Sequence, residues 1–349
     1  MLRPQSRLIN KRRGESYLKR CRFCGKTAEV SLRYANMRLC RDHFIEYIEK
    51  RVLKTIEQYK MIRPNERVVA AVSGGKDSVS LLHILAKLRE KLRFDLVPLH
   101  IDLGISVDDF SKRALEAFRE NCKELDIDGI VISLKDEYGF TIDNVASRSV
   151  RRRLRRPPCS VCGTIKRYLF NKAGVELNAD RVATGHNLTD EAIFLLQNLI
   201  DMNLDALLRY DPVLPSVPDV GLISKIKPLF QIYEFELELY AKFRDLKIVS
   251  GACPYRAGST LSEMKKILDE LENLRPGVSI VVVRNFLKKL KPALESKYGE
   301  QIKREVPLRR CSICNMATPL DICAFCKIRD VVLSEMRGNA AKDVSRAHQ

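Results

Sequence analysis

Residues 67–78, with the sequence RVVAAVSGGKDS, constrain the fold of this chain more than any other stretch. The apolar first half is typical of a buried parallel strand, and the glycines after it let the backbone pass close to a ligand. Lys76 and Asp77 would open the next helix, with Ser78 in its first turn, so that backbone N–H groups point at an anion. The stretch is neither the GxxxxGKS/T loop of kinases and GTPases nor the GxGxxG dinucleotide fingerprint. It predicts a phosphate-cradling turn of another kind, against the alternative of a Gly-rich turn in an ordinary α/β fold.

Strand-like and helix-like segments alternate after residue 67. This alternation predicts an α/β fold with a doubly wound parallel sheet, helices on both faces and the site at the carboxyl ends of the strands. A nucleotide would then lie above Ser73, His100 and Gly185. Further helices are expected at 44–62, 226–241 and 261–298. The predicted core consists of strand 67–72, helix 79–92, strand 94–101, helix 107–125, strand 129–134, helix 162–178 and strand 181–184.

Basic residues outnumber acidic residues by 62 to 44, which gives a formal net charge of +18. Such an excess indicates a polyanionic partner. Arginine occupies six of the nine positions 148–156, and a second basic run at 303–310 precedes a cysteine cluster. We interpret these runs as contacts to a nucleic acid backbone, with a solvated charged face as the alternative. The candidate RNA-binding residues are Arg151, Arg152, Arg153, Arg155 and Arg156.

No apolar run approaches the roughly 18–20 residues that a membrane helix needs. The basic first twenty residues lack the apolar centre of a secretory signal, so we expect a solvated arm and a soluble cytoplasmic protein, with a transit peptide as the minor alternative. Eleven cysteines in such a chain indicate metal or redox chemistry rather than a disulfide framework.

Eight residues have the spacing of two closed zinc sites. One pattern is C-x2-C-x15-C-x2-H and the other is C-x2-C-x8-C-x2-C. Both patterns bring four ligands to one tetrahedral ion, which leaves no position for a substrate, so both metals would be structural. The first set is Cys21, Cys24, Cys40 and His43; the second is Cys311, Cys314, Cys323 and Cys326.

Cys159 and Cys162 form a further CxxC pair, but no matching pair lies nearby. The remaining candidate partner is Cys253, about ninety residues later, and we expect both segments to be loops at the rim of the nucleotide site. Three thiolates with an open fourth position suit an iron–sulfur cluster. Two of them could instead carry persulfide and resolving roles in sulfur transfer, and inert loop cysteines are the plainest alternative.

The segment 180–200 reads DRVATGHNLTDEAIFLLQNLI, a strand followed by a turn and a helix. Asn187 or Thr189 would cap that helix. Asp190 and Glu191 would stabilise its start through the helix dipole, by a few tenths of a kcal/mol each. Considered by itself, His186 would be a hydrogen-bonded structural histidine.

Several motifs together resemble one enzyme family. SGGKDS after a hydrophobic strand is similar to the PP-loop of the ATP pyrophosphatases, whose fold is of the adenine nucleotide alpha-hydrolase type. Together with PPCSVCGTIKRYL, ATGHNLTDEA, GACPYR and the two terminal zinc patterns, it resembles the tRNA 2-thiouridine synthetases of the TtuA kind. That family replaces the 2-oxygen of uridine 54 in the T-loop of tRNA with sulfur through an adenylated intermediate. The related wobble uridine 34 thiolases are the alternative.

The resemblance implies a set of site residues and partners. Cys159, Cys162 and Cys253 would bind a [4Fe-4S] cluster whose fourth iron holds the incoming sulfur, with Lys166 and Asp190 as catalytic residues. It also implies a ubiquitin-like sulfur carrier with a C-terminal thiocarboxylate, tRNA as substrate and a homodimer. ATP, with Mg²⁺ between its phosphates, would contact Ala71, Ser73, Gly74, Gly75, Lys76, Asp77, Ser78, His100, Ile101 and Gly185.

We expect three domains: an N-terminal zinc finger with a linking helix at 1–60, a PP-loop catalytic domain at 61–302, and a C-terminal zinc ribbon and tail at 303–349. Two hypotheses of other classes remain. One is a zinc-ribbon RNA-binding protein that has lost catalysis, and the other is an ATP-dependent amidotransferase or ligase that uses ammonia. The second would leave the three loop cysteines without a role.

Overall fold

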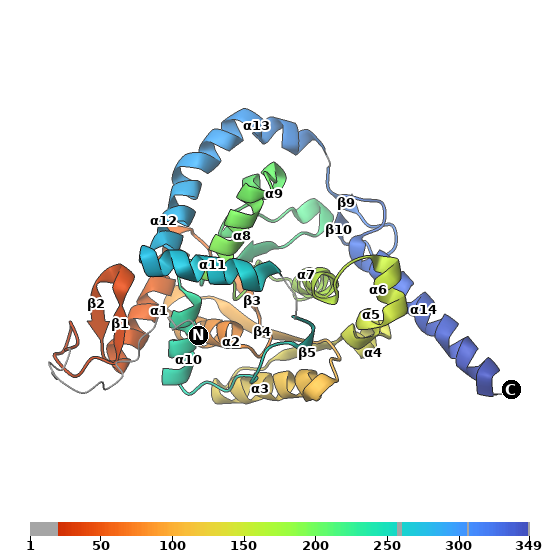
Figure 1. The fold of residues 1–349 in the computed structure, drawn as a ribbon, viewed down its shortest axis with the longest axis horizontal. Coiled ribbons are helices and arrows are strands. Elements are labelled where there is room, and N and C mark those ends of the chain that lie inside the picture. Colours follow the sequence, from red (N-terminus) through yellow and green to blue (C-terminus); the bar gives the residue numbers. More distant parts are fainter. Residues whose placement is uncertain (1–19, 257–259, 306, 348–349) are drawn as a thin grey trace.

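A six-stranded sheet forms the centre of the computed structural model, which describes residues 20–256, 260–305 and 307–347 (Figure 1). Five strands are parallel, and only the edge strand β7 runs antiparallel to its neighbour β8. This confirms the doubly wound α/β prediction. In spatial order the strands are β5 (Ile130–Ser133), β4 (Asp95–Asp102), β3 (Arg67–Ala71), β6 (Arg181–Ala183), β8 (Ser224–Ile226) and β7 (Val213–Leu214).

Helices cover both faces of the sheet because its central strands are apolar on both sides. In β3, Val68 and Ala70 contribute to one core, whereas Val69 contributes to the other. The first core includes α2 (Lys76–Leu92), α3 (Phe110–Glu124) and α10 (Glu234–Phe243). The second includes α4 (Leu134–Tyr138), α5 (Ile142–Ala146), α6 (Arg148–Leu154) and α7 (Pro158–Glu176).

The N-terminal module is a short hairpin followed by a helix. Strands β1 (Val30–Leu32) and β2 (Met37–Leu39) pair antiparallel, and α1 (Arg41–Gln58) packs against α10 and α2. Phe44, Ile48, Val52 and Ile56, the face predicted from helical periodicity, are all buried. The module is therefore docked on the sheet domain through one apolar stripe of α1.

A third layer of helices lies beyond β6 and leads to the C-terminal module. Figure 1 shows α12 and α13 arching over α8 and α9 toward the strands β9 and β10, with α14 extending away from the body. The bounds are α8 (Leu188–Ile200), α9 (Leu204–Leu208), α11 (Thr260–Leu274), α12 (Val278–Asn285), a π-helical turn (Phe286–Leu290), α13 (Lys291–Glu305), β9 (Arg309–Arg310), β10 (Ala317–Thr318) and α14 (Ala324–Ala347). No helix within the described ranges is both long and apolar enough to span a bilayer.

Several predicted boundaries are wrong. The single helix expected over 226–241 is instead the end of β8, a turn at Pro228, and α10 from Glu234. The helix expected from residue 107 begins at Phe110, because Asp108 and Asp109 have positive φ angles of 52° and 50°. Strands β7 and β8 were not predicted, since β7 has only two residues and β8 (SKI) has no apolar run.

Candidate active site

The loop between β3 and α2 folds around the hydroxyl of Ser78. This oxygen accepts a hydrogen bond from the backbone N–H of Ser73 at 3.0 Å and donates one to the carbonyl of Gly75 at 3.0 Å. Gly74 has a φ of +82°, a backbone conformation that residues other than glycine rarely adopt. Because Lys76 begins α2, the N-terminus of that helix faces the loop, as an anion site requires.

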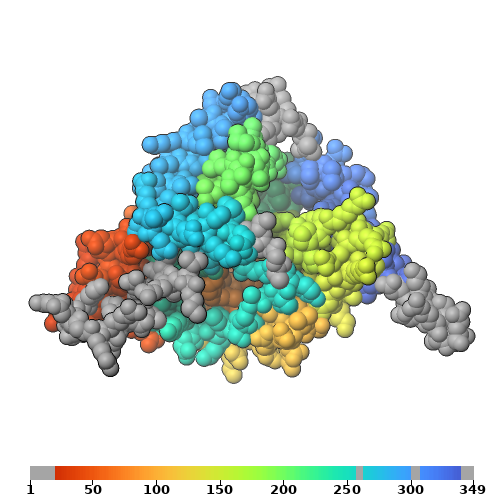
Figure 2. Space-filling view, viewed as in Figure 1, coloured from red at the N-terminus to blue at the C-terminus, as the bar shows by residue number. Residues whose placement is uncertain are grey.

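Two loops meet at this end of the sheet. The order β4-β3-β6 reverses direction between β3 and β6, and ligands of doubly wound sheets bind at such a switch point. A Cβ atom on Gly185, which follows β6, would lie 3.1 Å from the backbone nitrogen of Ser78. The space-filling view shows a hollow on this side of the molecule, between α11 and the segment 245–256 (Figure 2).

Acidic groups and one lysine converge at the start of α2. Lys76 Nζ lies 2.9 Å from Glu234 Oε1 and 3.3 Å from Asp77 Oδ2. Burial, with Asp190 and Glu234 nearby, raises the pKa of Asp77 to about 6 despite the opposing charge of Lys76. Oδ1 of Asp77 is buried and has no hydrogen-bond partner among the described residues. An unpaired oxygen in this acidic setting suits a divalent cation such as Mg²⁺.

Asp190 has two sets of neighbours. In α8 it completes a capping box: its backbone N–H donates to Asn187 Oδ1 at 3.1 Å, while its carboxylate accepts from the Asn187 N–H at 3.4 Å. The side chain still reaches solvent through the open mouth of the site, but the protein that surrounds it and the charge of Glu234 raise its pKa. The helix-stabilising role expected from sequence is therefore present, and the carboxylate also faces the nucleotide loop.

His186 is held as a neutral imidazole. Its Nδ1 lies 2.9 Å from Thr184 Oγ1. Burial of the ring, together with Lys227 and Lys166, lowers the His186 pKa to about 4, although one edge of the side chain remains accessible. At neutral pH the residue therefore carries no charge, and its surroundings are strongly positive.

His100 and Ile101, predicted to contact ATP, occupy neighbouring positions near the end of β4. Because side chains alternate along a strand, His100 stacks on Phe118 whereas Ile101 belongs to the core on the other face. Both side chains are buried. His100 Nδ1 lies 2.9 Å from the carbonyl oxygen of Val72, so the ring holds the backbone at the start of the nucleotide loop.

The thiols of the CxxC pair are on a helix rather than in a loop. Pro157 caps α7 and Pro158 begins it, which places Cys159 and Cys162 in its first turns. The loop expected at Cys159 was therefore wrong, whereas Cys162 lies in the helix that was predicted to begin there. Cys253 lies immediately before a 3-10 turn (Pro254–Arg256) that packs against α7.

The three thiols share one neighbourhood with Lys166. Burial raises the pKa of Cys162, the charge of Lys166 opposes this, and Cys253 and Cys159 raise it further. The charge of Lys166 also lowers the pKa of His186, in the turn that follows β6. Among the described residues, two clusters of four bring their metal-ligating atoms within 4.8 Å of one another, and these three thiols belong to neither.

Those two clusters are the predicted zinc sites. In the N-terminal cluster, Cys24 Sγ and Cys40 Sγ lie 3.8 Å apart, and in the C-terminal cluster Cys314 Sγ and Cys323 Sγ lie 3.7 Å apart. A zinc ion with Zn–S bonds of about 2.3 Å and tetrahedral geometry separates its sulfurs by about 3.8 Å. Burial would raise the pKa of Cys311, but backbone N–H groups outweigh it and lower the pKa to about 6, which favours the thiolate.

The arginine run folds into helix α6, whose last turn opens into a groove of about 450 Å³. The lining residues 148, 151, 152 and 155 recur at helical spacing, and Arg153 instead points to α14, where it lies 2.9 Å from Glu335. Val150 is buried beneath the helix. The groove is lined by Arg148, Arg151, Arg152, Arg155, Arg156 and Pro157.

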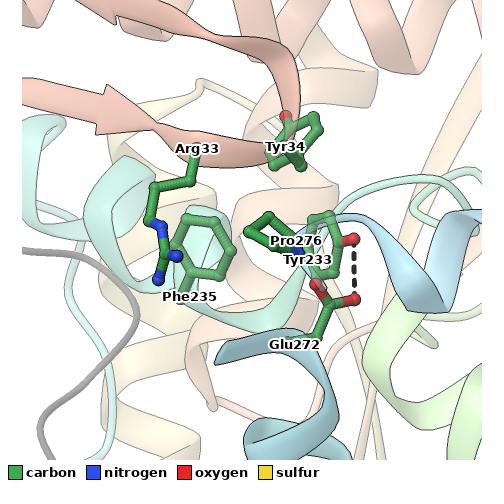
Figure 3. A pocket seen from close by; sticks show the side chains of 6 residues that line it. All are labelled: Arg33, Tyr34, Tyr233, Phe235, Glu272 and Pro276. Carbon is green, nitrogen blue, oxygen red and sulfur yellow. Dashed lines mark hydrogen bonds between the residues drawn. The ribbon is translucent and has the colours of Figure 1, made fainter. Parts of the chain in front are cut away.

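A second cavity lies where the N-terminal hairpin meets α10 and α11 (Figure 3). Its volume of about 20 Å³ holds about one water molecule. The buried carboxylate of Glu272 accepts hydrogen bonds from Tyr233 Oη at 2.9 Å and from the backbone N–H groups of Gly277 and Ser279. This cavity is a structural joint and has no room for a substrate.

Two site residues were missed by the sequence reasoning. Glu234 binds both Lys76 and Lys265 of α11, but nothing in the sequence marks the first residue of α10 as part of the site. The positive charge of Arg256 partly opposes the rise in the pKa of Asp190 that burial causes. Its signal was available, because it is the last residue of the GACPYR motif already singled out.

Comparison with known proteins decides the family. Residues 45–253 match the PP-loop domain family, and residues 20–45 match the N-terminal LIM domain of 2-thiouridine synthetase TtuA. The tRNA-5-methyluridine(54) 2-sulfurtransferase of Pyrococcus horikoshii is 40% identical, over 88% of this chain and 93% of that protein. The chain belongs to the tRNA-5-methyluridine(54) 2-sulfurtransferase family. The protein of the same name from Thermotoga maritima is 38% identical, over 90% of this chain and 97% of that protein.

A solved structure supports the same family. The U34-tRNA thiolase NcsA from Methanococcus maripaludis, determined with its [4Fe-4S] cluster, superposes with a TM-score of 0.71 at 27% identity. The match covers 88% of this chain and 95% of that chain. The expected family membership is thus confirmed, with family models that match the N-terminal module and the PP-loop domain.

Proposed function

We propose that this protein is a tRNA 2-sulfurtransferase, which replaces the 2-oxygen of a uridine by sulfur and converts ATP to AMP and pyrophosphate. The observation that carries the proposal is the meeting of two features at one end of the sheet, the PP-loop after β3 and the thiol-bearing start of α7. The position favoured is uridine 54, because relatives named for it are 36–40% identical. Wobble uridine 34 is the alternative, supported by the NcsA relative at 30% identity.

ATP would lie across the PP-loop, with its phosphates on the N-terminus of α2. Backbone N–H groups of residues 73–78 would hold the phosphates, and Gly185 leaves the space for a close approach. Asp77 would ligate Mg²⁺ through the oxygen that has no protein partner. Since the side chains of His100 and Ile101 are buried, those residues would contact the nucleotide through their backbone.

The chemistry would proceed in two displacements. The uridine 2-oxygen attacks the α-phosphorus of ATP, the bond to the β-phosphate oxygen breaks, and pyrophosphate leaves. Sulfur then attacks C2, the C2–O bond breaks, and AMP departs with the oxygen. Lys166 would stabilise negative charge that develops near the thiols, and Asp190 would act at the nucleotide side. The target base must leave its stack to reach this site.

Cys159, Cys162 and Cys253 would hold a [4Fe-4S] cluster. When bound, such a cluster supplies an iron with a free coordination position for the incoming sulfur. Two Zn²⁺ ions would occupy the terminal modules as structural metals. We further propose a ubiquitin-like carrier with a C-terminal thiocarboxylate as sulfur donor, a homodimer, a cytoplasmic location, and domain limits at 1–60, 61–302 and 303–349.

Metal analysis after anaerobic purification and reconstitution tests this proposal. We expect about four irons and two zincs per chain, with iron lost in Cys159→Ala. Cys122→Ala is the matched control, because the Cys122 thiol is buried in α3 on the other face of the sheet. This variant should keep its iron. Zinc without iron in the wild type would instead support persulfide chemistry on the same cysteines.

The activity itself is tested with ATP, a sulfide source and an unmodified tRNA transcript. We expect AMP release and a thiolated nucleotide that mass spectrometry maps to position 54. Sulfur at position 34 would establish the wobble alternative. A protein that binds the transcript but releases no AMP would be the non-catalytic RNA-binding protein, and ammonia-dependent AMP release without thiolation would identify a ligase.

A further inference from the structure

Two arginine side chains share one hydroxyl group at the start of α7. Nη2 of Arg156 donates to Thr164 Oγ1 at 2.9 Å, and Nη2 of Arg167 donates to the same oxygen at 3.3 Å. Arg156 also binds the carbonyl and hydroxyl oxygens of Ser160, at 3.1 and 3.0 Å. Across the described part of the chain, neither guanidinium group forms an ion pair with a carboxylate. Two like charges held this close lack a compensating anion.

The positive charge continues inward from Arg167. Burial and the charge of Arg156 lower the pKa of Arg167, and burial and the charge of Arg167 lower the pKa of Lys225. Lys225 lies in β8, where it pairs with Val182 of β6, the strand that leads to Gly185. Arg156 and Arg167 meet at Thr164, and Lys225 lies on the strand next to β6; we term these three residues the cationic track.

We propose that the cationic track binds successive phosphates of the RNA strand that carries the target uridine and leads this strand from the arginine groove to the PP-loop. The inference rests on the proposed function and specifies the path of its substrate. Part of the Arg167 side chain is exposed, so a ligand can reach it. Its guanidinium also passes over Gly163, where an added Cβ would lie 3.5 Å from Nη1, so the fork is held beside the thiols.

The pattern of charge favours an RNA backbone over other anions. Arg156 belongs both to the groove of about 450 Å³ and to the track, so the two form one continuous surface. A nucleic acid strand presents a phosphate at every nucleotide and can occupy such a surface along its length. The C-terminus of a carrier protein presents a single carboxylate and would leave most of these cations unpaired. Arginine also binds phosphate oxygens through two parallel hydrogen bonds.

The test is the salt dependence of binding to an unmodified tRNA transcript. Affinity would be measured by filter binding between 50 and 300 mM KCl, on the reconstituted protein and on Arg167→Gln. Each lost phosphate contact should reduce the slope of log K against log salt by about 0.7–0.9, and should weaken binding at 100 mM about five- to eightfold. Lys225→Gln, on a different element, should reduce the slope by the same amount.

Arg119→Gln is the matched control, since this exposed arginine lies on α3 over the opposite face of the sheet and should leave the slope unchanged. The proposal is overturned if Arg167→Gln and Lys225→Gln both keep the wild-type slope while retaining two zincs and native circular dichroism. If, with that slope unchanged, both variants lose affinity for a carrier-protein C-terminal peptide or for pyrophosphate, the cations bind that anion in place of RNA. Wild-type protein that binds no transcript would refute the proposed function as well.

Discussion

A buried ion pair fastens the N-terminal zinc module to the sheet domain. Nη1 of Arg51 in α1 lies 2.5 Å from Oε1 of Glu236 in α10, and the Tyr34 hydroxyl donates to the same oxygen at 2.5 Å. The side chain of Glu236 has no exposed surface, whereas that of Arg51 is 17% exposed. The carboxylate therefore depends on these donors, and on the Tyr233 N–H at 2.9 Å, for all of its compensation.

Replacing Arg51 by methionine should destabilise the protein by about 3–5 kcal/mol, because it leaves a buried carboxylate without its cation. A Coulomb estimate agrees, since two unit charges about 4 Å apart interact by about 4 kcal/mol at an effective dielectric constant of 20. The double variant Arg51→Met/Glu236→Leu removes both charges and should recover at least about 2 kcal/mol of this loss.

Urea unfolding of the zinc-loaded protein, followed by far-ultraviolet circular dichroism, measures these differences. Hydrogen exchange of residues 41–58 reports in parallel whether the loss is local to α1. Lys50→Met is the control, because the pair of Lys50 with Glu46 is exposed on the same helix and should leave the stability essentially unchanged. The reasoning is refuted if Arg51→Met costs under about 1 kcal/mol, or if the double variant is no more stable than Arg51→Met.

Three further outcomes are expected. Gly74→Ala should reduce ATP affinity at least about tenfold in calorimetry, because φ is +82° and the new Cβ would lie 3.0 Å from a backbone oxygen of α3. The control Gly299→Ala, inside α13, should leave ATP affinity unchanged. Tyr255→Phe should lower retained iron about tenfold with both zincs kept, since its hydroxyl anchors the Cys253 segment to Asp143 at 2.7 Å; unchanged iron would contradict this. Burial lowers the pKa of His83, so the unfolded chain takes up this proton at a higher pH than the folded protein does. The unfolding free energy should therefore fall as pH drops through about 6.5. His83→Gln should lose less unfolding free energy than the wild type between about pH 7.5 and 5.5.

The sheet domain was predictable because its central strands are buried on both faces. Such strands appear in the sequence as short apolar runs, and the run that ends in SGGKDS locates the switch point directly. The two terminal metal-ligand clusters were equally predictable, since all four members of each cluster lie within about 25 residues of one another. Strands β7 and β8 were not, because β7 has only two residues and β8 has the sequence SKI, so neither contains the apolar run that marks the inner strands.

Side-chain directions account for most of what the sequence did not reveal. Six arginines between 148 and 156 predicted a basic surface, but only the helix α6 shows that Arg148 joins the groove and that Arg153 points to α14. Glu234 reaches Lys76 across 158 positions of the chain, a contact that no local pattern encodes. Arg167 was passed over because a charged residue on a helix is ordinarily a solvated one.

The stacking of Tyr168 in α7 on Phe325 in the C-terminal module has a consequence for biosynthesis. The two rings are parallel within 3° at 3.8 Å, and Val161, Ile165 and Leu169 share a core with the C-terminal cysteines. The chain leaves the ribosome N-terminus first, so α7 emerges long before the C-terminal module that covers it. Until the C-terminal module is made, the apolar face of α7, whose first turns carry Cys159 and Cys162, lacks its cover. Nascent chains stalled short of residue 311 should therefore be the most vulnerable to oxidation and aggregation, and a premature stop there should cost far more than the loss of one zinc.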